Sequence, residues 1–150
     1  MIESTINTIT PLIANDSSVV FQNDFRTGSA CGCGSWLCHN TGSANYDIVK
    51  GGLYDIDFSA TVSSATAGVV SFALFNNGEE IAGSRMTTTV TADGFANIAT
   101  STTLRVCCNA NSNISVRAIS TVQTPSDPTT PITTQVPILT SATLTIKRKG

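Results

Sequence analysis

The residues best suited to chemistry in this sequence are five cysteines and one histidine. Four of them lie within one short segment: Cys31, Cys33, Cys38 and His39. The other two, Cys107 and Cys108, are adjacent and far along the chain. Thiolates and imidazole are ligands that zinc prefers, and a structural zinc site would hold a loop that has little core of its own. The Cys-x-Cys spacing differs from the Cys-x-x-Cys pair of common zinc sites, so a structural zinc remains one alternative among others.

The sequence leaves three states open for these cysteines. Free thiols behave as small hydrophobic side chains, and a reducing cytoplasm disfavours bridges. A disulfide formed after release from the cell would link the loop around Cys31 and Cys38 to Cys107 or Cys108, and metal binding is the third state. The alternation that runs through Leu104 and Val106 predicts that Cys108 points inward and Cys107 outward. Because the number of cysteines is odd, at least one thiol stays free or pairs between chains.

Catalytic patterns are weak in this chain. His39 is the only possible imidazole base, and without an oriented third group it is more simply a structural histidine. Asp55 and Asp57 share one face, as carboxylates do in calcium sites or acid–base pairs, but any solvated strand face gives that spacing. The sequence carries no phosphate-binding glycine loop and no protease or hydrolase motif. We therefore expect a protein that is not an enzyme and needs no cofactor.

The elements that must position these residues are strands, and two runs are most informative. In Gly52–Val62, apolar side chains alternate with polar ones, which predicts a half-buried strand. The following run is apolar on both faces, so it needs a second covering surface. On its outer face lie Val69, Ala73 and Phe75, which we take as candidates for a contact between subunits. An ordinary two-sided core is the alternative.

These two runs also carry a resemblance to a known family. The pattern Gly52-x-Tyr54-x-Ile56-x-Phe58, a turn of small residues, and then Val70-x-Phe72-x-Leu74-Phe75-x-Asn77-Gly78 resembles the centre of a jelly roll. This jelly roll is shared by tumour necrosis factor, the globular head of the first complement component, spore-filament tips and small accessory proteins of phage virions. The resemblance covers about residues 45–120 plus the last strand. It implies an all-β sandwich that assembles as a tight trimer, and it does not by itself imply a function.

The rest of the chain fits a single domain over residues 1–150. We expect an edge strand or an arm laid on a neighbour at 1–14, a Cys/Gly-rich loop at 27–45 around a short strand at 35–39, and a short strand at 18–22. In the Pro/Thr-rich loop at 121–136, the prolines rule out regular strand pairing. A loop of this length in a compact domain is normally functional or disordered, and we expect a functional one.

The composition limits the kinds of partner that this protein is expected to bind. Charged residues make up 12% and the net charge is −2, so nothing indicates nucleic acid binding. The first residues show neither a secretory signal nor a membrane span, so we expect synthesis in a host cytoplasm and no membrane partner. A low charge density suits a surface that neighbours cover.

We therefore predict a trimeric accessory protein of a virion, either a head decoration or a head fibre on a phage capsid. Its partners would be the major capsid protein or another virion protein, and its far end would meet host surface glycans. Six residues are candidates for the capsid contact: Pro125, Pro128, Pro131, Lys147, Arg148 and Lys149. The alternative is a trimeric ligand- or glycan-binding module of a bacterial surface, similar to a spore-filament tip. A metal-dependent enzyme is a third alternative and would need the Cys/His loop to hold metal with an open position.

Overall fold

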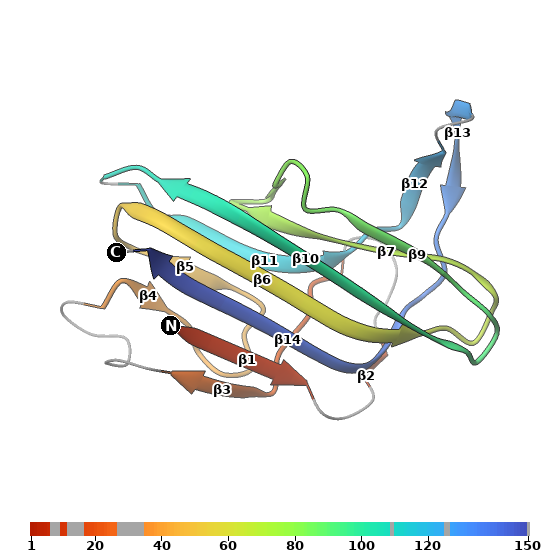
Figure 1. The fold of residues 1–150 in the computed structure, drawn as a ribbon, viewed down its shortest axis with the longest axis horizontal. Coiled ribbons are helices and arrows are strands. Elements are labelled where there is room, and N and C mark those ends of the chain that lie inside the picture. The colour runs from red at the N-terminus through yellow and green to blue at the C-terminus, as the bar shows by residue number, and fades with distance from the viewer. Residues whose placement is uncertain (7–9, 12–16, 27–34, 109, 125–126, 150) are drawn as a thin grey trace.

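A computed structural model describes the chain except residues 7–9, 12–16, 27–34, 109, 125–126 and 150 (Figure 1). Its described residues form strands, turns and loops. The strands are β1 (Ile2–Ile6), β2 (Thr10–Pro11), β3 (Asn23–Arg26), β4 (Leu37–Cys38), β5 (Tyr46–Ile48), β6 (Gly52–Ser63), β7 (Gly68–Asn76), β8 (Glu79–Glu80), β9 (Met86–Val90), β10 (Phe95–Val106), β11 (Ser112–Ala118), β12 (Thr121–Thr124), β13 (Asp127–Thr133) and β14 (Ile138–Lys149). Within the described ranges there is no helix of the length and hydropathy that a membrane crossing requires.

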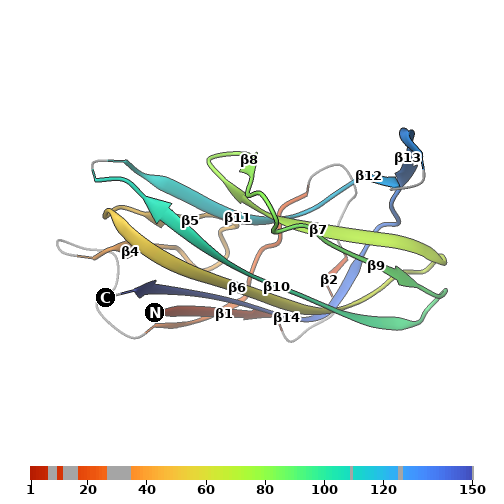
Figure 2. The same ribbon diagram turned by 45° about the horizontal axis from the view of Figure 1, so that its top comes forward.

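Two antiparallel sheets lie face to face (Figures 1 and 2). Sheet A has the order β10-β6-β14-β1-β3, with β2 also paired to β14. Sheet B has the order β4-β5-β11-β7-β8, with β9 also paired to β7. The chain passes between the sheets from β5 to β6, from β6 to β7, from β9 to β10 and from β10 to β11, as in a jelly roll. A third pair, β12 and β13, stands away from both sheets, and both views show it at one end of the molecule.

The core lies between the two sheets and follows the predicted alternation. In β6 every second side chain from Tyr54 to Val62 is buried, while the residues between them are exposed or half-buried. Strand β6 lies in the middle of sheet A, between β10 and β14, so its inward side chains meet those of sheet B directly. The ring of Phe58 lies 6.1 Å from the ring of Phe72 in β7, measured between centroids. The half-buried strand read from the sequence is confirmed.

The turn after β7 is also as predicted. Phe75 pairs with Glu80 and Asn76 with Glu79, which leaves Asn77 and Gly78 as a two-residue loop. Both loop residues have positive φ angles, 52° and 85°. This is the requirement of a type I′ hairpin, which asparagine and glycine meet at low steric cost.

The N-terminal segment differs from the expectation. Strand β1 is an internal strand of sheet A, paired with β14 on one side and β3 on the other. It is therefore neither an edge strand nor an arm on a neighbour. The segment expected as a strand at 18–22 instead crosses from sheet B to sheet A and fills the core with Val19 and Phe21, both fully buried. This segment then leads into β3, which pairs with the edge of β1 that would otherwise be unpaired.

The Pro/Thr-rich segment also differs from the expectation, because it forms a paired two-stranded ribbon, β12–β13. Regular pairing survives since a two-stranded ribbon has an outer edge on each strand, and a proline there loses no ladder hydrogen bond. Pro131 lies opposite Gln123, and the register shifts between Gln123 and Thr124. The prolines are therefore compatible with strand pairing in this ribbon.

Candidate functional site

His39 is a buried part of the protein framework. Its Nδ1 atom lies 2.8 Å from the carbonyl oxygen of Asn45, and its Nε2 atom lies 3.3 Å from a carboxylate oxygen of Asp24. The ring stacks on Tyr46 with centroids 3.8 Å apart. The Asp24 carboxylate also accepts a hydrogen bond from the Thr41 hydroxyl, 2.8 Å away. Both ring nitrogens thus face oxygen atoms of the chain, and the ring joins the end of β3 to β5. The expected structural role of His39 fits this geometry.

The cysteines are only partly within the described ranges. Cys31 and Cys33 lie outside them, and Cys38 is half-buried in β4. Cys107 and Cys108 are exposed free thiols. A bridge from the loop to either of them, one of the three states considered above, stays a prediction. Cys108 does not point inward as predicted, because β10 ends at Val106 and the strand alternation ends with it.

A metal centre on the cysteines stays a prediction. Within the described part of the chain, no three or more histidine, cysteine, aspartate or glutamate side chains gather as metal ligands would.

Asp55 and Asp57 lie on the outer face of sheet A and are engaged by neighbouring strands. The Thr103 hydroxyl donates to Asp55 at 2.6 Å, and the Lys149 ammonium lies 3.0 Å from the same carboxylate. The Thr103 hydrogen bond, followed by Lys149, lowers the pKa of Asp55. The Ser101 hydroxyl donates to Asp57 at 2.5 Å. These contacts describe a solvated strand face, as the spacing indicated.

The outer face of β7 is covered in part by the chain itself. Ala73 is fully buried against Ile119, which precedes the ribbon, and Val122, which lies in β12. Val69 and Phe75 pack against the same cluster and remain half-buried. The apolar outer face of this strand therefore has an intramolecular cover. Ala73 is closed to a neighbouring subunit, and a subunit contact through Val69 and Phe75 stays a prediction.

The candidate capsid contacts lie in two separate places. Pro131 is exposed in β13, where Pro128 also lies, and Pro125 is outside the described residues. Lys147, Arg148 and Lys149 are exposed residues of β14, not a free tail. Arg148 donates to the carbonyl oxygen of Gly51 at 2.9 Å. Their role in binding a capsid stays a prediction.

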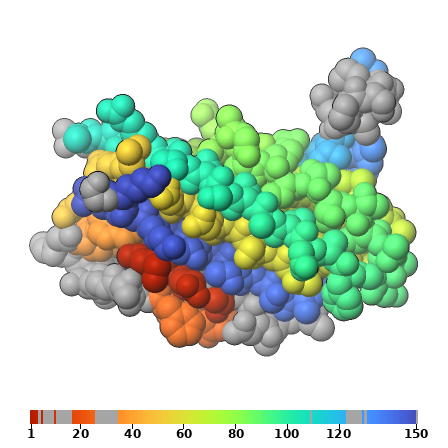
Figure 3. Space-filling view, in the orientation of Figure 1, coloured from red at the N-terminus to blue at the C-terminus, as the bar shows by residue number. Residues whose placement is uncertain are grey.

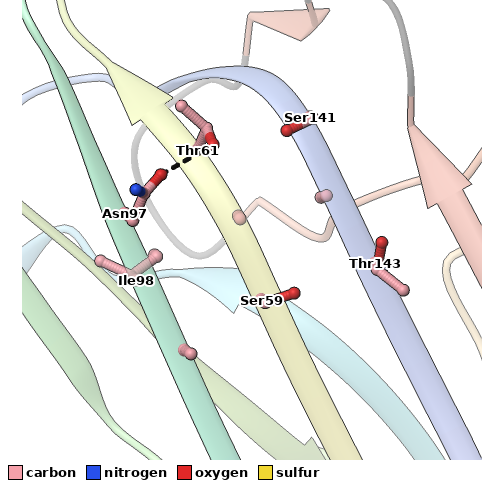
Figure 4. A pocket seen from close by; sticks show the side chains of 9 residues that line it. Ser59, Thr61, Asn97, Ile98, Ser141 and Thr143 are labelled. Carbon is pink, nitrogen blue, oxygen red and sulfur yellow. Dashed lines mark hydrogen bonds between the residues drawn. The ribbon is translucent and has the colours of Figure 1, made fainter.

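A site that the sequence reasoning missed is the outer face of sheet A. Along β6, β10 and β14, the side chains in the middle of this face are small and uncharged (Figure 4). Ser59 pairs with Ala99 on one side and with Thr143 on the other, which places three short side chains in one row. Next to this row, the Thr61 hydroxyl donates to Asn97 at 2.8 Å (Figure 4). The result is a shallow trough with a hollow of about 300 Å³.

The margins of the same face carry large apolar side chains. Phe95 is 70% exposed at one end of β10, Phe25 is 64% exposed on the edge strand β3, and Leu53 is 45% exposed at the start of β6. In the space-filling view, the strands of sheet A lie side by side across this face, and no coloured segment crosses over its middle (Figure 3). The sequence signal for the trough is the small uncharged residues at alternate positions of 59–61 and 97–103. The same spacing is also what any solvated strand face gives.

Comparison with known proteins gives a likeness of structure alone. No family model matches the sequence. No curated protein matches it either.

Among the solved structures that resemble this chain, two cover nearly all of it. The globular domain of zebrafish complement 1qA protein has a TM-score of 0.62 at 8% sequence identity, and the match covers 99% of this chain and 98% of that one. Murine APRIL has a TM-score of 0.54 at 11% identity, covering 95% and 97%. At such identities the likeness concerns the fold. The predicted fold class is confirmed: the protein is an all-β jelly-roll sandwich of the tumour necrosis factor and complement-head type.

Proposed function

We propose that this chain is a non-enzymatic structural module that forms a homotrimer through the outer face of sheet A, and that it serves as an accessory protein on a virion. The observation that carries the assembly is the uncovered, uncharged trough around Ser59, Ala99 and Thr143. Small side chains let another copy approach the backbone closely, and the large apolar side chains at the margins would be removed from water. This site replaces the outer face of β7, where Ala73 is closed by the chain's own ribbon segment.

The number of copies comes from the resemblance described above, which implies a tight trimer. The electrostatics of the face support contact between identical surfaces. At one end of it, carboxylates and basic groups alternate: Asp55 pairs with Lys147 across strands, and Lys149 forms an ion pair with Asp55. A face that mixes both signs gives little net repulsion between copies.

The assembly is tested by placing a charge in the trough. Ala99 is exposed in the protomer, so Ala99→Asp should fold. We expect the wild-type protein to sediment at three times its protomer mass of 15.6 kDa, and Ala99→Asp to sediment as a monomer with an unchanged circular dichroism spectrum. Ala82→Asp, the same change at an exposed turn outside sheet A, should remain trimeric. A monomeric wild-type protein, or a trimeric Ala99→Asp variant, would contradict the proposal.

The place on a virion rests on the sequence resemblance and on the low charge density. In such a setting, the ribbon β12–β13 and the basic residues Lys147, Arg148 and Lys149 are the proposed contacts with a capsid protein. The test is quantitative mass spectrometry of purified virus particles, produced by a phage whose genome encodes the chain. A fixed ratio of the chain to the major shell protein supports this role, and its absence from intact particles refutes it.

A second candidate is a ligand- or glycan-binding surface module. One observation favours it, a polar hollow beside Phe75 on the outer side of sheet B.

A further inference from the structure

We propose that the hollow between the β7–β8 hairpin and the β12–β13 ribbon is a binding site for a neutral saccharide. The hollow has a volume of about 600 Å³. Its lining comes from three parts of the chain: Phe75 and Glu80, Arg85, and the ribbon with the residues that lead into it. Strands β8 and β12 lie on the side of the molecule away from sheet A (Figure 2). The proposal is therefore independent of the trimer, because one protomer supplies the whole site.

The floor of the hollow is apolar and aromatic. Phe75 is half-buried, and the guanidinium carbon of Arg117 lies 4.6 Å from the centre of its ring. This contact holds the ring in place by a cation–π attraction. Ile119 and Pro131 add apolar surface beside it. Such a floor matches the C–H face of a sugar ring, which is the apolar surface that a polyhydroxyl compound presents.

The walls supply planar charged groups and hydroxyls. Arg85 Nε donates to Glu80 Oε1 at 3.0 Å, and a second guanidinium nitrogen of Arg85 contacts the other carboxylate oxygen. The pair keeps both side chains partly exposed, 42% for Arg85 and 28% for Glu80. Ser120 and Thr121 line the opposite wall. A carboxylate and a guanidinium held in one plane present adjacent acceptors and donors, which suit neighbouring hydroxyl groups on a ring.

The charge balance selects a neutral ligand. Glu80 and Arg85 offset each other, so the wall favours neither an anion nor a cation. The volume is within the range of small-molecule sites. The lining is more polar than apolar, which suits a ligand that carries many hydroxyl groups. A monosaccharide or a short oligosaccharide fits both the size and the polarity.

The test is saturation-transfer difference NMR on the full-length protein with four probes: the methyl glycosides of glucose, galactose, mannose and N-acetylglucosamine. We expect saturation transfer to at least one of them at millimolar concentration. In Glu80→Gln and Arg85→Gln, which change side chains that are at least partly exposed, affinity for that probe should fall at least tenfold. Glu79→Gln is the matched control, since Glu79 is the adjacent exposed carboxylate and does not line the hollow.

Each result decides the proposal. Loss of affinity in the two wall variants with no change in Glu79→Gln supports it. Equal affinity in Glu80→Gln and wild type would overturn it, because the ligand would then bind elsewhere. The absence of saturation transfer from the wild-type protein to all four glycosides would overturn it as well. Since no wall residue belongs to sheet A, sedimentation of the same samples separates this outcome from a failure of the trimer.

Discussion

His39 shows what one residue contributes to the framework. Its ring connects three features that are distant in the chain: the Asp24 carboxylate, the Asn45 carbonyl and the Tyr46 ring. Replacing it by leucine would remove the donor to the Asn45 carbonyl oxygen and the ring nitrogen that faces the Asp24 carboxylate. A buried polar group that loses its partner typically costs about 1–3 kcal/mol.

We therefore expect His39→Leu to lower the free energy of unfolding by about 1–3 kcal/mol in urea titrations. The exposed neighbouring variant Asn40→Ala should change it by less than about 0.5 kcal/mol. If His39 had no structural role, the free energy of unfolding of His39→Leu would equal that of the wild-type protein.

Asp55 gives a pH dependence at the same scale. The Thr103 hydrogen bond and the Lys149 charge lower the pKa of Asp55, so its contribution to folding is present at neutral pH and is lost as the pH falls through this lowered pKa. Asp55→Asn should melt below wild type at pH 7, and the difference should shrink as the pH falls through the lowered pKa of Asp55, because the wild-type carboxyl then becomes neutral as well. Differential scanning fluorimetry across pH 2–7 measures this. A difference that stays constant over the range would show that Asp55 acts by shape and not by charge.

At the scale of elements, the ribbon β12–β13 depends on its base. An isolated two-stranded ribbon has marginal stability in water. Here Val122 packs against Ala73 and Ile119, and the buried Thr134 hydroxyl donates to the Ile119 carbonyl. These contacts join the ribbon to the outer side of sheet B and so shape the proposed saccharide site.

Thr134→Val should release the base of the ribbon, because it removes this hydrogen bond and keeps the shape of the side chain. The expected cost is about 1 kcal/mol. Amide hydrogens of the ribbon should exchange faster, while those of β6 keep their protection. Thr133→Val, at the exposed neighbouring position, is the control and should leave ribbon exchange unchanged. Equal exchange in both variants would show that the hydrogen bond does not hold the ribbon.

The elements also show which parts of the structure were readable from sequence. The β6 strand was predictable because its alternation and its burial have the same period, and the β7–β8 turn because Asn77 and Gly78 tolerate positive φ angles. The ribbon was not predictable, because the number of prolines does not show that each of its strands has one unpaired edge where a proline is tolerated. The internal position of β1 was not predictable either, because it depends on β3 returning to cover it.

The candidate sites were less readable than the fold. Local spacing did not reveal the His39–Asp24 contact, since Asp24 lies in a different strand. The trough on sheet A had the pattern of a solvated strand face, and only the arrangement of three strands shows that its small side chains form one row. The hollow beside Phe75 is lined in part by the ribbon. The prolines of residues 121–136 predict that no such ribbon forms, so the sequence gives no sign of the hollow.

The whole molecule places its two proposed surfaces on opposite sides. Sheet A would meet other copies, and the hollow on the outer side of sheet B would remain open three times per trimer. A weak saccharide contact repeated three times gains strength when the ligands are also repeated on a surface. This arrangement fits a module that is held at one place by protein contacts and meets a glycan-bearing surface with its exposed sides.

Assembly should also govern stability at this scale. If unfolding separates three chains, the ratio of folded trimer to unfolded chains depends on the square of the protein concentration. Each tenfold rise in concentration therefore changes this ratio a hundredfold, which stabilises the trimer by about 2.7 kcal/mol. With an unfolding entropy of about 2.1 cal/mol/K per residue, the melting temperature should rise by about 3 °C per tenfold. Calorimetry between about 1 and 100 μM measures this rise. Ala82→Asp should show the same dependence, whereas Ala99→Asp should melt at one temperature throughout. A wild-type melting temperature that does not depend on concentration would mean that the protomer is stable alone, and the outer face of sheet A would then be an ordinary solvated surface.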